Sequence, residues 1–209
     1  MVQKTGKRAR GRPRAYDPDQ ALARAMDTFW IGGYSGTSLD ALSASTGMQR
    51  PSLYGAFGDK RSLYLEALER YTDESIASMR ETLDFESSLR DGLATLYHSA
   101  ISFYAPRNAD PRGCFLIGTA AVEAMSDPGI RNRLRKALRR LDRVFEDRFR
   151  QAQATGELDR QADPAALAKM ASAVLHTLAL RSRAGDSRPS LRAIAEHGVQ
   201  MICGARSRR

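Results

Sequence analysis

The chain has 209 residues, 42% of them hydrophobic and 27% charged, so it is long enough and apolar enough to bury a substantial core. Its net charge of +9 favours anionic partners such as nucleic acid. There is no run of about 18 apolar residues that could span a membrane, and no apolar segment follows the basic N-terminus as in a secretory signal, so we expect a cytoplasmic protein that does not enter a membrane.

The N-terminal arm, residues 1–15, contains six basic residues and no acidic one before position 15, and therefore carries two thirds of the net charge. Its segment Arg10-Gly11-Arg12-Pro13-Arg14 has the form of an AT-hook core. Such a strip can lie in a narrow minor groove, where arginine meets a strong negative potential. We therefore predict that Arg12 and Arg14 contact DNA. The alternative is a disordered tail that only increases solubility.

The first predicted helix begins at Asp17-Pro18, where an aspartate cap is followed by proline in the first turn. Apolar residues recur at helical spacing up to Trp30, and Gly32-Gly33 ends the helix. Thr37 or Ser38 caps a second helix of about two turns, over 39–46.

A third short helix is predicted over 50–57, and it follows Gly47, which can adopt the positive φ of a tight turn. Two short helices joined by such a turn form a helix-turn-helix. Pro51 falls in the first turn of the third helix, where its missing N–H costs nothing. Leu53 and Phe57 anchor this helix, and its other face can meet base edges and phosphates in the major groove. The alternative is an ordinary surface helix beside a ligand site.

Six further helices follow, and Asp-Pro pairs open two of them. Their expected ranges are 60–83, 87–105, 114–125, 128–154, 164–183 and 189–203. We find no alternating strand pattern and no internal repeat. The sequence therefore predicts an all-α protein of about nine helices: a three-helix DNA-binding domain at 16–62 and a helical effector-binding and dimerisation domain at 63–209.

The segment AYDPDQALARAMDTFWIGGYSGTSLDALSASTGMQRPSLYGAFGDKRSLY resembles the DNA-binding domain of TetR/AcrR-type transcriptional regulators. The match covers about residues 10–65 and includes G-Y-x-x-T-S, G-x-x-x-x-S-L-Y and F-x-x-K followed by leucine. Ser43 departs from the alanine that is more common there, and the resemblance fades beyond about residue 70.

The resemblance implies DNA contacts from residues of the second and third helices and from Lys60, which also lies at a helix N-terminus that favours phosphate. Arg50 is the best candidate for reading a base, because arginine pairs bidentately with guanine. The implied contact residues are Thr37 or Ser38, Gln49, Arg50, Pro51, Ser52, Tyr54, Gly55 and Lys60.

The resemblance also implies a homodimer, formed by the last two helices of each chain, that binds a palindromic operator in double-stranded DNA. The four helices before them would enclose a cavity for an unknown small-molecule effector. Ordinary core packing is the alternative for each aromatic residue. The candidate lining residues are Tyr97, Phe103, Tyr104, Cys114, Phe115, Met125, Phe145 and His176.

Cys114 follows Arg112-Gly113 at the predicted start of a helix, and both the helix N-terminus and the arginine favour a thiolate. A subset of the resembling family senses oxidants or electrophiles through a cysteine in such a Gly-Cys pair. The alternative, which we favour, is a buried cysteine that acts as a small hydrophobic residue. Cys203, His98 and His176 lack metal-ligand spacing, so we expect no metal and no cofactor.

These observations favour a ligand-responsive DNA-binding regulator, most simply a repressor that an effector releases. A dimeric DNA-binding protein without a regulatory role is the second hypothesis. A small helical enzyme is the third, but the sequence has no nucleophile–base pair, phosphate loop or paired carboxylates at useful spacing.

Overall fold

The computed structural model describes residues 17–86 and 88–204, and within these ranges every regular element is a helix. The all-α prediction is therefore confirmed. The N-terminal elements are α1 (Pro18–Gly36), α2 (Leu39–Thr46), α3 (Arg50–Phe57) and α4 (Lys60–Phe85). The later elements are α5 (Leu89–Tyr104), the π-helical turn η1 (Leu116–Ala120), α6 (Ala121–Glu123), α7 (Pro128–Thr155), α8 (Pro164–Arg183) and α9 (Arg188–Cys203).

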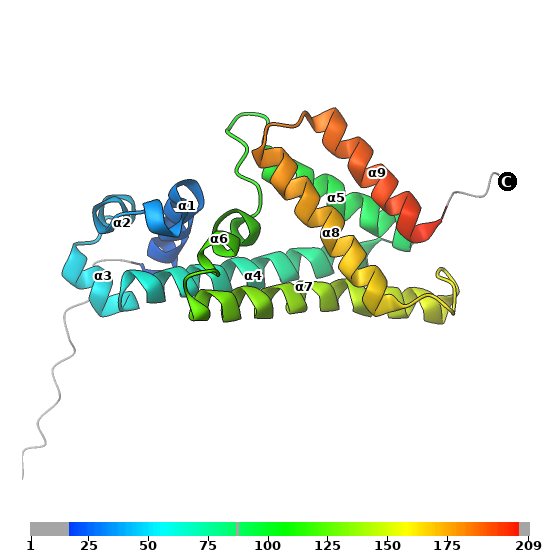
Figure 1. Ribbon diagram of the computed structural model, residues 1–209, viewed down its shortest axis with the longest axis horizontal. Coiled ribbons are helices and arrows are strands. Elements are labelled where there is room, and N and C mark those ends of the chain that lie inside the picture. Colours follow the sequence, from blue (N-terminus) through cyan, green and yellow to red (C-terminus); the bar gives the residue numbers. More distant parts are fainter. Residues whose placement is uncertain (1–16, 87, 205–209) are drawn as a thin grey trace, which may run out of the picture.

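The helices form an elongated molecule in which α4 and α7 lie side by side along the long axis (Figure 1). Helices α1 to α3 cover one end of this pair, and α5, α8 and α9 pack at the other end. A single core of buried side chains runs through both ends, from Ala21 in α1 to Ile202 in α9. The two ends are therefore mechanically continuous through α4.

The three Asp-Pro signals begin helices as expected. Asp17, Asp127 and Asp163 each accept hydrogen bonds from backbone N–H groups of the first turn, with N–O distances between 2.7 and 3.5 Å. Each aspartate thus satisfies donors that have no partner within the helix.

Two predicted helices differ from the structure. Gly33 adopts φ 69° and breaks the first helix where expected, but one more helical turn follows before Gly36. The predicted helix over 114–125 begins only after Cys114 and runs first through η1. The Thr119 hydroxyl donates to the carbonyl of Phe115 at 2.7 Å, a carbonyl that the Thr119 N–H would bond in an α-helix. Sequence periodicity does not detect such a local expansion.

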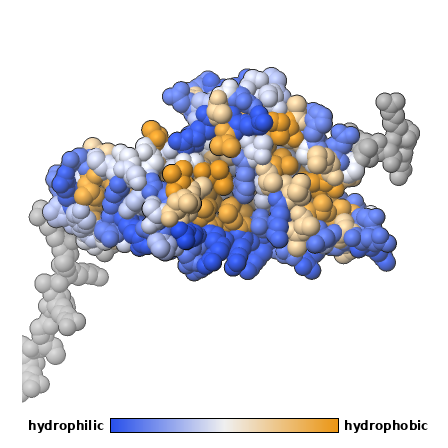
Figure 2. All heavy atoms as spheres, viewed as in Figure 1, coloured by the Kyte–Doolittle hydropathy of each residue, from blue (hydrophilic) through white to orange (hydrophobic). Residues whose placement is uncertain are grey.

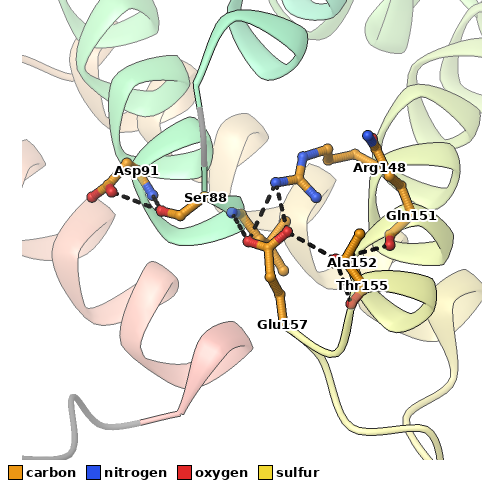
Figure 3. A network of polar contacts seen from close by, with 8 residues as sticks. Ser88, Asp91, Arg148, Gln151, Ala152, Thr155 and Glu157 are labelled. Atoms are coloured by element: carbon orange, nitrogen blue, oxygen red, sulfur yellow. Dashed lines mark hydrogen bonds and ion pairs between the residues drawn. The ribbon is translucent and has the colours of Figure 1, made fainter.

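A polar network joins α5 to the loop after α7, at the end remote from α3 (Figure 3). The Glu157 carboxylate accepts from the Leu89 N–H at 2.5 Å and lies 3.3 Å from the Arg148 guanidinium. Burial opposes ionisation of Glu157, but the Leu89 hydrogen bond and the charge of Arg148 lower its pKa. Glu157 therefore supplies a cap for α5 that comes from another part of the chain.

Candidate nucleic-acid interface and cavity

Helix α3 stands on the surface because its turn and its two apolar residues fix its orientation. Gly47 adopts the left-handed conformation, φ 70° and ψ 14°, in the turn from α2. Leu53 and Phe57 are buried, and α3 packs against α2 and α4. The predicted helix-turn-helix geometry is confirmed.

The opposite face of α3 carries the residues predicted to meet DNA, and all of them are exposed. We call this face the recognition surface; it consists of Gln49, Arg50, Pro51, Ser52, Tyr54 and Gly55. Tyr54 is 45% exposed although it is aromatic. Hydrogen-bonding groups that face solvent on a protruding helix are available to a DNA groove. Their contacts with DNA stay a prediction.

Arg50 is held by an ion pair that the sequence did not indicate. Its Nη2 lies 2.5 Å from Oδ1 of Asp40 in α2, and its Nε donates to the same oxygen at 3.1 Å. Both side chains are more than half exposed. An exposed ion pair of this kind contributes little net free energy. Breaking it to form a contact between Arg50 and DNA would therefore cost little free energy.

Thr37 and Ser38, at the start of α2, differ in burial. Thr37 is buried, and its hydroxyl donates to the Gly33 carbonyl at 2.6 Å. This burial favours Ser38 over Thr37 for the predicted DNA contact. Ser38 is exposed and accepts from the Ala41 N–H as the α2 cap. The predicted DNA contact of Ser38 stays a prediction.

Lys60 lies in the first turn of α4, next to the recognition surface in the chain. Its ammonium sits 4.6 Å from the centre of the Tyr34 ring, and burial lowers its pKa. The ring orients the cation, and the predicted phosphate contact of Lys60 stays a prediction. Arg12 and Arg14 lie outside the described residues.

A cavity of about 400 Å³ opens between the two ends of the molecule. Helices α1, α4, α5, α7 and α8 contribute to its wall, together with the segment between α5 and η1. This volume is in the range of small-molecule sites. Four of the residues predicted to bind an effector line it, and their contact with an effector stays a prediction: Phe103, Tyr104, Cys114 and His176.

The other four predicted residues do not line the cavity. Tyr97 is fully buried and donates to the Ala171 carbonyl, and Phe145 stacks on Phe149 within the core. Phe115 is also fully buried, and its ring packs against three other aromatic rings behind the cavity. Met125 is 82% exposed, because it follows the short α6 at the surface. The cavity therefore gives no support to these four assignments.

Sequence reasoning missed the part of the cavity wall formed by α1 and α4. Met26, Asp27 and Trp30 belong to the predicted DNA-binding domain, and the apolar periodicity of Met26 and Trp30 is equally typical of core packing. Along α4, small polar residues follow Tyr71 at helical spacing and therefore share one face of the helix. This pattern could have predicted a cavity wall that is partly polar and partly aromatic. These residues are Tyr71, Ser75, Ser78 and Thr82.

Of the two environments considered for Cys114, the structure has the buried one. The thiol is buried, the Tyr71 hydroxyl donates to its sulfur at 3.3 Å, and burial raises its pKa. Arg112 does not offset this effect, because its guanidinium pairs with Asp27 at 3.0 Å. The structure therefore agrees with the favoured alternative, a buried cysteine, and its thiol lies on the cavity wall. Among the described residues, no group of three His, Cys, Asp or Glu side chains could hold a metal ion.

Besides the Arg112–Asp27 pair, polar contacts join the helix-turn-helix end to the rest of the molecule. Arg61 in α4 makes a bidentate pair with the α7 cap Asp127, at 2.6 and 2.9 Å. Glu123 in α6 accepts from the Ser35 N–H at 3.2 Å, and the Trp30 indole donates to the Arg112 carbonyl at 3.1 Å. A change around the cavity can reach α1 and α4 through these contacts.

Two family models match the chain. The model described as bacterial regulatory proteins, tetR family, matches residues 21–67. The model described as tetracyclin repressor-like, C-terminal domain, matches residues 90–197, which is more than half of the chain. No helix among the described residues has both the length and the apolar composition to cross a membrane.

Relatives match over nearly the full length. The HTH-type transcriptional repressor ComR of Escherichia coli is 32% identical over 189 residues, 90% of each chain. A second relative is a cysteine-substituted variant of the TetR family regulator CifR, which was solved in complex with 26-bp double-strand operator DNA. It is 35% identical to this chain, and the two structures superpose with a TM-score of 0.84. The match covers 91% of this chain and 98% of the CifR chain. Reduced E. coli NemR has the same fold, with a TM-score of 0.79 at 18% identity over 91% of this chain and 99% of that one.

Proposed function

Because this chain belongs to the TetR family and is therefore a DNA-binding transcriptional regulator rather than an enzyme, we propose that it is a cytoplasmic repressor that binds a palindromic operator as a dimer and leaves it when a small molecule occupies the cavity. The observation that carries this proposal is the position of the cavity. Its wall includes α4, which packs directly against α3, and α1, which packs against α2 and α4.

The proposed DNA contacts follow from exposure and charge. Arg50 would read a base, while Tyr54 and Lys60 would meet phosphates on either side of it. Ser38 would present the first turn of α2 to the backbone. Arg12 and Arg14 would enter the adjacent minor groove.

A dimer is supported by the apolar surface of α8 and α9. Met170 and Leu180 on α8 and Met201 on α9 are between 49% and 75% exposed. In Figure 2, hydrophobic side chains gather over α8 and over α6, whereas the edge along α7 is hydrophilic. Apolar side chains that form a continuous patch mark an interaction surface. Two-fold pairing through α8 and α9 would place two recognition surfaces against a palindrome.

Release requires that the effector bind the two dimer geometries with different affinity. A ligand in the cavity touches α1 directly, so a shift of α1 and α4 on binding would change the spacing of the paired recognition surfaces. The apolar wall and the hydroxyl groups on α4 are suited to a small, largely apolar molecule with a few polar groups.

The test is binding to DNA from upstream of the chain's own gene. We expect specific binding to a palindrome, with an affinity that falls steeply as salt increases, because phosphate contacts release counterions. Anisotropy of a labelled duplex measures it, and a duplex with both half-sites scrambled is the control. Equal affinity for the two duplexes would support a non-regulatory DNA-binding protein instead.

A second candidate mechanism rests on the position of the Cys114 thiol in the cavity wall. An oxidant or electrophile that enters the cavity would modify this thiol. Because burial raises the pKa of Cys114, we expect slow reaction with iodoacetamide at pH 7, and faster reaction only for reagents that first bind in the cavity. Operator release by such a reagent that persists in Cys114→Ser would eliminate this mechanism.

A further inference from the structure

The guanidinium of Arg112 occupies a position inside the cavity where a ligand could bind. It lies 4.5 Å from the centre of the Trp30 ring and 5.9 Å from that of Phe103. Its Nη1 is 3.0 Å from Oδ1 of Asp27. An aromatic face, a second ring and a carboxylate around one cation are the elements of an organic-cation site.

The backbone that carries Arg112 is fixed by several contacts, whereas its side chain is held only by a partly exposed ion pair and by aromatic rings. The Arg112 N–H donates to the Tyr104 carbonyl at 3.1 Å, and the Trp30 indole donates to the Arg112 carbonyl at 3.1 Å. At the next residue, a Cβ on Gly113 would lie 2.6 Å from the Ala179 carbonyl oxygen, so the segment is packed closely against α8. The guanidinium itself takes part in a half-exposed ion pair, which contributes little net stability.

The charges of the cavity wall favour a cation once Arg112 moves away. Arg112 is the only basic side chain in the wall among the described residues, and the acidic ones are Asp27 and Glu74. Glu74 already pairs with Arg70 at 2.8 Å. Burial lowers the pKa of His176, which therefore stays neutral. Displacing Arg112 would leave the Asp27 carboxylate and the Trp30 face without a cation.

We propose that the effector is an organic cation, with an ammonium group attached to a small aromatic or alkyl body, and that the Arg112 guanidinium occupies its site when no effector is bound. The ammonium takes the place of the guanidinium between Trp30 and Asp27, and the apolar body fills the cavity toward Tyr71 and Phe103. An anion would instead have to share Arg112 with Asp27, and the two like charges would repel each other.

This exchange has a regulatory consequence that rests on the proposed function. Asp27 and Trp30 belong to α1, whereas Arg112 belongs to the segment before η1. The Arg112–Asp27 pair is thus a side-chain tie between the two ends of the molecule. An effector that replaces Arg112 removes this tie and contacts α1 itself.

The test uses the fluorescence of Trp30, which is the single tryptophan of the chain and lies in the cavity wall. Benzyltrimethylammonium, benzyl alcohol and benzoate share a phenyl ring and differ in charge. We expect the cation to bind on the order of tenfold more tightly than either of the others, because the Trp30 ring and the Asp27 carboxylate both attract a cation.

Substitutions give effects of opposite sign. In Arg112→Met, which keeps an unbranched side chain, we expect the cation to bind roughly three to ten times more tightly, because its competitor is gone. In Asp27→Asn we expect several-fold weaker binding. Arg107→Met, in the same exposed segment, is the matched control and should bind as the parent does. If Arg112→Met does not fold, Arg112→Lys and Asp27→Asn carry the test.

The outcomes separate clearly. Tightest binding of benzoate, lost in Arg112→Met, would show an anion site and overturn the proposal. Equal binding of the three probes, or no binding of the cation in any variant at millimolar concentration, would also overturn it. Operator binding is measured on the same samples without probe. Intact operator binding with no cation site would refute this inference alone, whereas cation binding without operator binding would refute the proposed function.

Discussion

The recognition surface and the cavity are built in contrasting ways. Seven consecutive residues, 49–55, include the whole recognition surface, and its side chains point away from the core. The cavity wall draws residues from five helices and one connecting segment, and about half of them belong to the buried core. A local surface can change its chemistry without affecting the fold, whereas the cavity shares its side chains with the packing. The following substitutions test this contrast.

The largest effect is expected for Phe115→Ala. Phe115 is fully buried among Trp30, Tyr64 and Tyr71, with ring centres 5.5 to 5.7 Å away. Truncation should lower the free energy of unfolding by about 3–5 kcal/mol, because it removes packing and leaves a void. Urea denaturation measures the loss. Phe85→Ala is the control, since this side chain is 86% exposed. Equal stability of the two variants would contradict a shared core behind the cavity.

Arg50→Ala is expected to weaken specific operator binding by about 1–3 kcal/mol, because a bidentate base contact is lost. Its unfolding midpoint should stay within the error of the parent protein, since Arg50 is exposed. Anisotropy titration and thermal unfolding measure the two quantities. Arg24→Ala, an exposed arginine on α1, serves as the control. Unchanged operator binding in Arg50→Ala would remove α3 as the base-reading element.

Asp127→Asn tests the link between α4 and α7 through pH. Hydrogen bonds from Arg61 hold the pKa of Asp127 well below its usual range. A lowered folded-state pKa contributes stability above the unfolded pKa of about 3.9 and loses it as the pH falls below that value. The variant should be about 1 kcal/mol or less below the parent at pH 7, and the difference should shrink at pH 3. A constant difference across this range would show that the charge is irrelevant.

Asp40→Asn should have the smallest effect, in the opposite direction. Removing the carboxylate frees Arg50 and removes a negative charge near the DNA. We expect operator affinity to rise by less than about 1 kcal/mol, since the exposed pair is weak. Titrations at several salt concentrations measure it, and Asp84→Asn, an exposed position in the last turn of α4, is the control. A loss of affinity would mean that Asp40 positions Arg50 for base reading.

The sequence predicted the helix-turn-helix in detail because its determinants are local. Gly47, Pro51 and the spacing of Leu53 and Phe57 act within one or two turns of where they occur. The exposure of Tyr54 followed from the same spacing.

The cavity was predicted only in part, because its wall depends on how distant helices cross. Trp30 has the same apolar periodicity whether it packs in a core or faces a void. Phe115 and Phe145 have the composition of a ligand site but fill the interior. The raised pKa of Cys114 depends on burial by other elements, which the residues beside it in the sequence do not reveal.

The length of α4 has a geometric consequence. Its 26 residues run without interruption from Lys60 to Phe85, which corresponds to about 39 Å at roughly 1.5 Å per residue. A tilt of α4 by about 5° about its far end would carry the Lys60 end sideways by about 3 Å. In a two-fold dimer the distance between the two recognition surfaces would change by twice this amount, which is about half the width of a major groove of roughly 12 Å. A rearrangement at the cavity no larger than a rotamer change would thus be amplified, by leverage alone, into a misfit at the double helix.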